Sequence, residues 1–169
     1  LDEYEKTLVT TLTLNDVDLT GNGYSSAYGV FYIGSSSVLN VNGGQWNLSN
    51  DTHGSGGVFK ADAAEATLNI DGLELNAHNV RRVVTYAATT INNSTLTITG
   101  DADGVDAEME HGFNRSPLTI TNSTITMKDM VGRGITAEKG AVTINNSTVT
   151  IENVQEATIE VRGGQTVTV

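Results

Sequence analysis

The chain has 169 residues, which is enough for a single domain with a hydrophobic core of its own. It is acidic: 20 Asp and Glu against 9 Lys and Arg give a formal net charge of −11, which disfavours binding to nucleic acid or to anionic lipid. No run of 18 apolar residues is present to span a bilayer. Cysteine is absent, which is compatible with an exported repeat protein, because stacked repeats need no disulfides.

One phrase recurs along the chain: an apolar alternation, a corner of Asn, Asp or Gly, and a second apolar alternation. Residues 91–98, 120–127 and 144–151 are the clearest copies. The first apolar alternation ends at six anchors: Leu14, Val41, Ile70, Ile91, Ile120 and Ile144. Their mean spacing is 26 residues. A repeat of this length built from short alternating strands is typical of a solenoid.

Aligning the copies gives three strands per coil, each with an inward column. In the first strand, the inward column two residues before the anchors consists of Leu12, Leu39, Leu68, Thr89, Leu118 and Val142. In the second strand, it is Leu19, Trp46, Leu75, Leu96, Ile125 and Val149. The third strand is expected to begin at Val30, Val58, Val83, Val105, Ile135 and Ile159.

These columns predict an all-β fold, a right-handed parallel β-helix of about six coils with three short strands each. An antiparallel sandwich also has short strands between Asn and Gly turns, but it has no reason to repeat a three-strand phrase in register. Residues 1–169 are expected to form one β-helix segment. Because the chain opens at Leu1 without Met and closes on half a repeat phrase, we expect a fragment of a longer exported protein.

The segments 134–137 (GITA) and 141–151 (AVTINNSTVTI) resemble the coils of bacterial autotransporter passenger domains and, more widely, the pectin-lyase-like β-helix superfamily. The resemblance covers nearly the whole chain, and its motifs are structural. It implies an exported bacterial protein, extracellular or on the cell surface, which acts as an adhesin or self-associating factor and in some members as an enzyme.

Threonine pairs in the later coils are the first candidate binding surface. Each pair would point outward from a second strand and stack on the next coil. The pairs are Thr95 and Thr97, Thr124 and Thr126, and Thr148 and Thr150. Such an array resembles the ice-binding faces of some β-helical antifreeze proteins, but Thr is also simply a good outward strand residue.

The third strand offers a second candidate surface. If Val30, Val58 and Val83 point inward, alternation turns their neighbours outward into an exposed apolar and aromatic patch that could form contacts. The neighbours proposed for binding are Phe31, Ile33, Phe59 and Tyr86. A covering loop, or a bulge that turns these side chains inward, is the alternative.

A carboxylate cluster around Asp101, Asp103 and Asp106 is the only candidate metal site, and calcium is the cation it would suit. It lacks the spacing and closing Glu of a helix-loop-helix calcium site, so a solvated acidic edge is the simpler interpretation. The carboxylate, His and Arg motifs of pectin-degrading enzymes are missing, so no catalytic residues are expected.

The corner residues Asn93, Asn122 and Asn146 fit the N-glycosylation pattern, but turn chemistry also explains them, because Asn, Asp and Gly all suit a sharp bend. The predicted function is that of an adhesin or stalk segment. Its partner would be a surface glycan, a surface protein or a second copy, with neither nucleic acid nor direct membrane insertion involved. The alternatives are a non-catalytic part of a carbohydrate-active enzyme and, less favoured, an ice-binding protein. No cofactor is expected apart from calcium.

Overall fold

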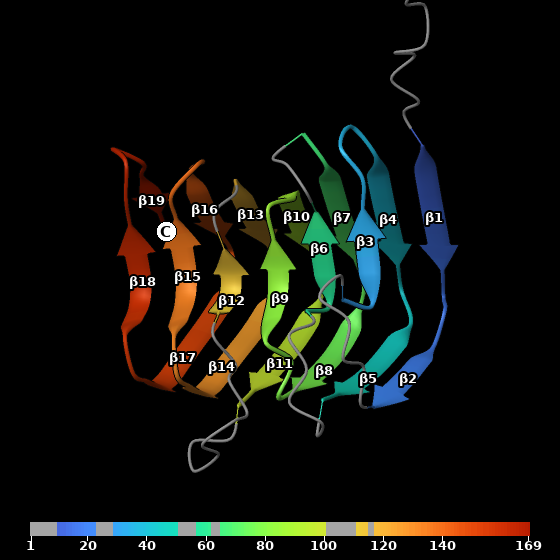
Figure 1. Cartoon of the computed structure of the whole chain (residues 1–169), viewed down its shortest axis with the longest axis horizontal. Coiled ribbons are helices and arrows are strands. Elements are labelled where there is room, and N and C mark those ends of the chain that lie inside the picture. The colour runs from blue at the N-terminus through green and yellow to red at the C-terminus, as the bar shows by residue number, and fades with distance from the viewer. Residues whose placement is uncertain (1–9, 23–28, 51–56, 62–64, 101–110, 115–116) are drawn as a thin grey trace, which may run out of the picture.

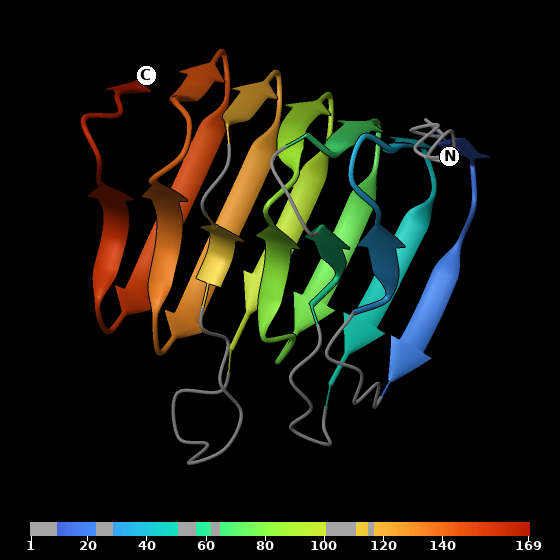
Figure 2. The same ribbon diagram turned by 45° about the horizontal axis from the view of Figure 1, so that its top comes forward.

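The computed structural model describes residues 10–22, 29–50, 57–61, 65–100, 111–114 and 117–169. These residues form three parallel sheets, which wrap around one core as a β-solenoid (Figure 1). Each turn of chain contributes one strand to each sheet, and the next turn stacks beside it (Figure 2). The predicted parallel solenoid with three strands per coil is confirmed.

We name the sheets A, B and C in the order in which the chain meets them. Sheet A contains β1 (Thr11–Asn15), β4 (Val38–Asn42), β7 (Thr67–Asp71), β10 (Ala88–Asn92), β13 (Leu118–Thr121), β16 (Val142–Asn145) and β19 (Val167–Thr168). Sheet B contains β2 (Leu19–Asn22), β5 (Gln45–Ser49), β8 (Glu74–His78), β11 (Thr95–Thr99), β14 (Thr124–Met130) and β17 (Thr148–Val154). Sheet C contains β3 (Phe31–Ile33), β6 (Phe59–Ala61), β9 (Arg82–Thr85), β12 (His111–Asn114), β15 (Arg133–Ala137) and β18 (Ala157–Val161).

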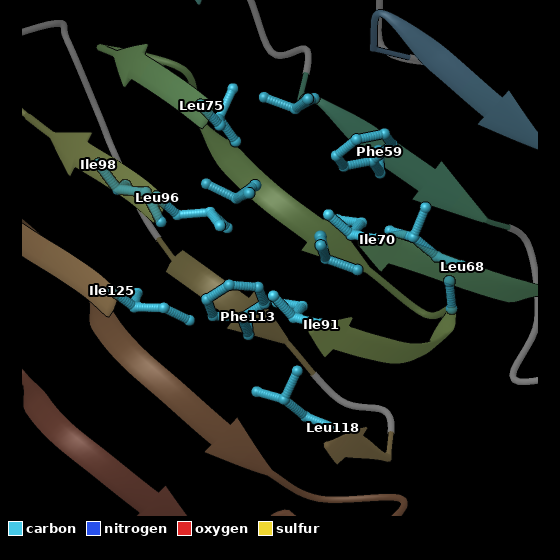
Figure 3. Packing of buried hydrophobic residues seen from close by; sticks show 14 of the residues in the cluster. Phe59, Leu68, Ile70, Leu75, Ile91, Leu96, Ile98, Phe113, Leu118 and Ile125 are labelled. Atoms are coloured by element: carbon cyan, nitrogen blue, oxygen red, sulfur yellow. The ribbon is translucent and has the colours of Figure 1, made fainter. Parts of the chain in front are cut away.

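The predicted columns of sheets A and B are in register residue by residue. Leu14 pairs with Val41, and the column continues through Ile70, Ile91 and Ile120 to Ile144. Leu19 likewise pairs with Trp46, at the start of the column that ends at Val149. The side chains of these columns fill the interior (Figure 3). Burial of this apolar surface is the main stabilising term for a fold of this kind.

The corner between sheets A and B explains why the repeat phrase contains Asn, Asp or Gly. At one equivalent position of this corner, every coil has a residue with a positive φ of 45° to 72°: Asp16, Gly43, Gly72, Asn93, Asn122 and Asn146. This left-handed backbone is accessible to Gly and, at low cost, to Asn and Asp. Turn chemistry therefore accounts for the three asparagines of the glycosylation pattern.

A serine next to this corner completes the backbone hydrogen bonding in the last three full coils. The Ser123 hydroxyl donates to the carbonyl of Thr121 (2.7 Å) and accepts from the amide of Ser94 in the preceding coil (3.1 Å). The Ser94 hydroxyl likewise donates to the carbonyl of Asn92 and accepts from the amide of Leu73. The Ser147 hydroxyl donates to the carbonyl of Asn145 and accepts from the amide of Ser123. The buried hydroxyl thus takes the place of a carbonyl acceptor where the strand ladder is interrupted.

Sheet C departs from the prediction by one residue. Phe31 pairs with Phe59, Phe59 with Val84, and the column continues through Phe113 and Ile135 to Ile159. The predicted column instead aligned Val30, Val58 and Val83 with Ile135 and Ile159. Each of these valines lies one residue before the residue that occupies this column in the structure. In the fourth coil the described part of the third strand is His111–Asn114, and the expected start at Val105 lies outside the described residues.

Candidate functional site on the outer face of sheet B

The outer face of sheet B carries three rows of polar side chains that run across the strands. The row nearest the first corner contains Gln45, Glu74, Thr95, Thr124 and Thr148. The middle row contains Thr20, Asn47, Asn76, Thr97, Thr126 and Thr150. The third row contains Asn22, Ser49, His78, Thr99, Lys128 and Glu152. The rows arise because alternate strand residues point outward and every coil pairs in register.

The six predicted threonines are brought together as expected. Thr95, Thr124 and Thr148 are exposed and adjacent, and Thr97, Thr126 and Thr150 form a half-buried row beside them. Together they make a grid of hydroxyl groups on β11, β14 and β17. Neighbouring strands in such a grid are about 4.8 Å apart.

A groove of about 550 Å³ lies on the same face, over the first four coils. It crosses β2, β5, β8 and β11, so it runs along the stacking direction of the coils. Its outward lining is Thr20, Asn22, Asn47, Ser49, Asn76, His78, Thr97 and Thr99. Gly21, Leu48 and Ala77, which alternate with the two polar rows, provide the apolar part of the lining.

Hydrogen bonds between coils hold the groove's side chains in place. The Asn76 amide donates to Oδ1 of Asn47 (3.0 Å), and Nδ1 of His78 is 2.9 Å from Oγ1 of Thr99. A side chain held by a neighbour loses less conformational entropy when a ligand binds. The described lining therefore offers amide, hydroxyl and imidazole groups, several of them held by a neighbouring side chain, and contains no Asp, Glu, Lys or Arg.

Charges lie at the borders of the groove. Glu74, which accepts a hydrogen bond from Gln45 (3.1 Å), stands in the first row beside Asn76. In the third row, Lys128 and Glu152 form an ion pair of 2.7 Å outside the groove lining. The hydrogen bond to Glu152 and its negative charge raise the pKa of the Lys128 ammonium group. The described part of this face thus has no unpaired cation to attract an anionic ligand.

Sequence reasoning missed most of the groove, although the signal was present. The expected site consisted of threonine pairs in the last three coils, and only Thr97 of that set lines the groove. In the first coils the residue types of the middle and third rows vary from coil to coil, so no repeated motif marks them as a surface. Their shared outward position is nevertheless fixed by the same alternation that placed the threonines.

The expected apolar patch on sheet C is wrong. Phe59 and Ile33 are buried, with exposed fractions of 0% and 4%, and Phe31 is half-buried against the core. Phe31, Trp46 and Phe59 form an internal aromatic cluster with ring centroids 5.3 to 5.9 Å apart. Val58 and Val83, which were expected to point inward, are also fully buried. Two consecutive residues of these coils, Val58 with Phe59 and Val83 with Val84, therefore face the interior, so the strict alternation on which the patch depended does not hold there.

Tyr32 and Lys60, not their neighbours, point outward from the first strands of sheet C. Phe31 and Ile33 also border an apolar hollow of about 210 Å³ beside Leu12 in the first coil. Tyr86, the fourth proposed contact residue, is half-buried against the core in a left-handed conformation (φ 65°). The Lys139 ammonium lies 5.8 Å from the centre of the Tyr86 ring.

The candidate calcium ligands Asp101, Asp103 and Asp106 lie outside the described residues. Among the residues that the structure does describe, no group of three or more acidic or histidine side chains is placed to hold a metal ion. The described segments also contain no helix that is long and apolar enough to cross a membrane.

Comparison with protein-family models, with curated proteins and with solved structures found no match for this chain. The architecture itself is a parallel β-solenoid, compatible with the β-helix superfamily.

Proposed function

We propose that this chain is a glycan-binding segment of a bacterial adhesin, secreted or displayed on the cell surface, and that the groove on sheet B takes an uncharged polysaccharide. The observation that carries the proposal is the groove itself: it is about 550 Å³ in volume, it crosses four coils, and its described lining consists of polar and apolar residues with no Asp, Glu, Lys or Arg. The resemblance of residues 141–151 to autotransporter coils supports a location outside the cell.

The lining matches the chemistry of a sugar hydroxyl, which both donates and accepts hydrogen bonds. Asn47 and Asn76 offer amide donors and acceptors, and Thr20 offers a hydroxyl that can do either. Such groups orient a ligand, while the apolar floor can contact the C–H faces of a sugar ring. Glu74 on the same face and the net charge of −11 disfavour an anionic glycan.

Blocking the groove with a bulky strand-compatible residue tests the proposal. Asn76→Tyr places a ring in the groove, and Asn69→Tyr places the same ring on the outer face of sheet A one strand earlier in the same coil. The two asparagines are closely matched: each donates its amide to an asparagine 29 residues earlier, at 3.0 and 2.9 Å. Both changes introduce tyrosine, a residue that strands favour.

We expect the wild type and Asn69→Tyr to bind the same neutral glycans on a glycan array and by calorimetry. Asn76→Tyr should lose at least tenfold in affinity while keeping the same circular dichroism spectrum and melting temperature. Equal binding by the two variants would reject the groove as the site. Binding of only anionic glycans would reject the proposed ligand chemistry.

A further inference from the structure

The outer face of sheet A differs from the rest of this acidic molecule because it is almost uncharged. Seven strands contribute to the face, and Asp71 is the only charged residue within their bounds. The strands of sheet B contain Glu74, Lys128, Asp129 and Glu152, and those of sheet C contain Lys60, Arg82, Arg133 and Glu160. In a chain of net charge −11, sheet A is therefore the face with the least electrostatic repulsion between identical molecules.

The outward side chains of the face are also regularly arranged, because its strands pair in register. Its central outward row consists of Thr13, Asn40, Asn69, Thr90, Thr119, Thr143 and Thr168. Amide hydrogen bonds run along the row, from Asn69 to Asn40 (2.9 Å) and from Asn40 to Thr13 (3.2 Å). A neighbouring row of small side chains includes Val38, Thr67 and Ala88, all half-buried. Small, ordered side chains let a second flat sheet approach closely.

We propose that the outer face of sheet A binds the same face of a second copy of this chain. The second copy is the fitting occupant because it presents the same strand spacing, the same small residues and the same lack of charge. A partner with a charged surface would find a single complementary group, Asp71. Such an isologous contact closes as a two-fold dimer and does not use the groove on sheet B.

The size of the face sets the expected strength of this contact. With six strand intervals of about 4.8 Å and strands of about five residues, each copy contributes on the order of 500 Å². The two faces together would bury about 1,000 Å², at the lower limit for a specific interface. The dimer should therefore be weak and reversible. Raising the salt concentration should strengthen it, because salt screens the repulsion between the two acidic molecules.

Thr90 identifies the centre of the face, since β10 is the fourth of its seven strands and Thr90 lies in the central row. In any two-fold arrangement centred on the face, Thr90 lies opposite Thr90 of the second copy. Because the natural chain has no cysteine, a single Thr90→Cys change gives a unique cross-linking site. Thr97→Cys is the matched control: a half-buried, outward threonine in the same coil, but on sheet B.

We expect a short bismaleimide to cross-link Thr90→Cys into a covalent dimer at least tenfold faster than Thr97→Cys at the same protein concentration. Sedimentation analysis of the cysteine-free wild type should show a monomer–dimer equilibrium that Thr90→Asp abolishes and Thr97→Asp leaves intact. A purely monomeric wild type at millimolar concentration would overturn the proposal. So would equal cross-linking at both positions, which would indicate random collisions. Glycan binding is measured independently, so either proposal can fail without the other.

Discussion

At the scale of single residues, the first corner of each coil depends on a side chain that accepts a left-handed backbone. Asn122 has a φ of 50° and accepts a hydrogen bond from Asn146 in the next coil (2.6 Å). A β-branched residue in this conformation is strained by about 1–3 kcal/mol. We therefore expect Asn122→Val to lower the free energy of unfolding by about that amount, measured by urea denaturation.

Asn122→Gly is the control for this corner, because Gly accepts the same φ without strain but also removes the exposed bond to Asn146. The loss should stay below about 1 kcal/mol, since an exposed side-chain hydrogen bond contributes little. If Val and Gly destabilised the protein equally, the hydrogen bond rather than backbone conformation would account for the choice of Asn.

The buried serine beside the corner should contribute more to the stability of the fold than the small size of its side chain suggests. Ser123 is 4% exposed, and its hydroxyl is the acceptor for the amide of Ser94. Ser123→Ala leaves that amide without a partner, which costs about 1–3 kcal/mol. The exposed neighbour Thr124→Ala should change stability by less than about 0.5 kcal/mol. Equal effects in thermal denaturation would contradict the role assigned to the hydroxyl.

Core positions can be distinguished from surface positions one residue away. Ile120 is fully buried, and its neighbour Thr119 points outward on sheet A. Ile120→Asp would bury a charge with no partner and should abolish cooperative folding, whereas Thr119→Asp should leave the melting temperature nearly unchanged. Retention of wild-type stability by Ile120→Asp would show that the first strand has been assigned the wrong inward face.

At the scale of strands, the aromatic cluster ties sheets B and C together in the first two coils. Trp46 of β5 and Phe59 of β6 are both fully buried, and the Trp46 indole donates to the carbonyl of Val17 (2.8 Å). Phe59→Ser should cost at least about 3 kcal/mol, because it leaves a cavity and brings a hydroxyl into the core. The test is to compare the denaturation of Phe59→Ser with that of the control Lys60→Ser, whose side chain points outward. Similar stabilities of the two variants would contradict the orientation of β6.

How much of the fold could be predicted depended on the length of each connection. The corner between sheets A and B is nearly constant in length, for example Asn93-Ser94 between β10 and β11, so counting residues places both strands in register. The connection from sheet B to sheet C ranges from two residues, between β14 and β15, to eleven, between β11 and β12. No count across so variable a connection fixes the register. Val30, Val58 and Ile135 each follow a glycine, at Gly29, Gly57 and Gly134, and this shared pattern favours an alignment that sets two different strand positions level.

Steric contacts at these glycines show where the alignment failed. A Cβ at Gly29 would lie 2.6 Å from the carbonyl oxygen of Gly57, and one at Gly112 would lie 2.6 Å from that of Gly134. Gly57 is level with Arg82, whose carbonyl accepts from the amide of Val58, and Arg82 pairs with His111 rather than with Gly112. The two glycine pairs therefore stand one position apart in the strand. This single step places Phe31 and Phe59, rather than the valine before each, in the column of Ile135 and Ile159, and their burial removes the expected patch.

At the scale of the whole molecule, register between coils determines every proposed surface. The groove on sheet B and the uncharged face of sheet A both exist only if residues 21 to 29 positions apart lie side by side. Paired cysteines in the naturally cysteine-free chain can test this directly. Thr97 and Thr126 are direct partners in β11 and β14, so their Cα atoms should be about 4.8 Å apart, within reach of a disulfide.

The decisive measurement is oxidative disulfide formation in two double variants, followed by mass spectrometry. Thr97→Cys with Thr126→Cys should form an intramolecular disulfide. Thr97→Cys with Thr124→Cys should not, because these diagonal positions lie about 8 Å apart and cannot be bridged without backbone movement. If the diagonal pair formed its disulfide as readily as the direct pair, or if neither formed one, the stacking of the coils in this register would be contradicted.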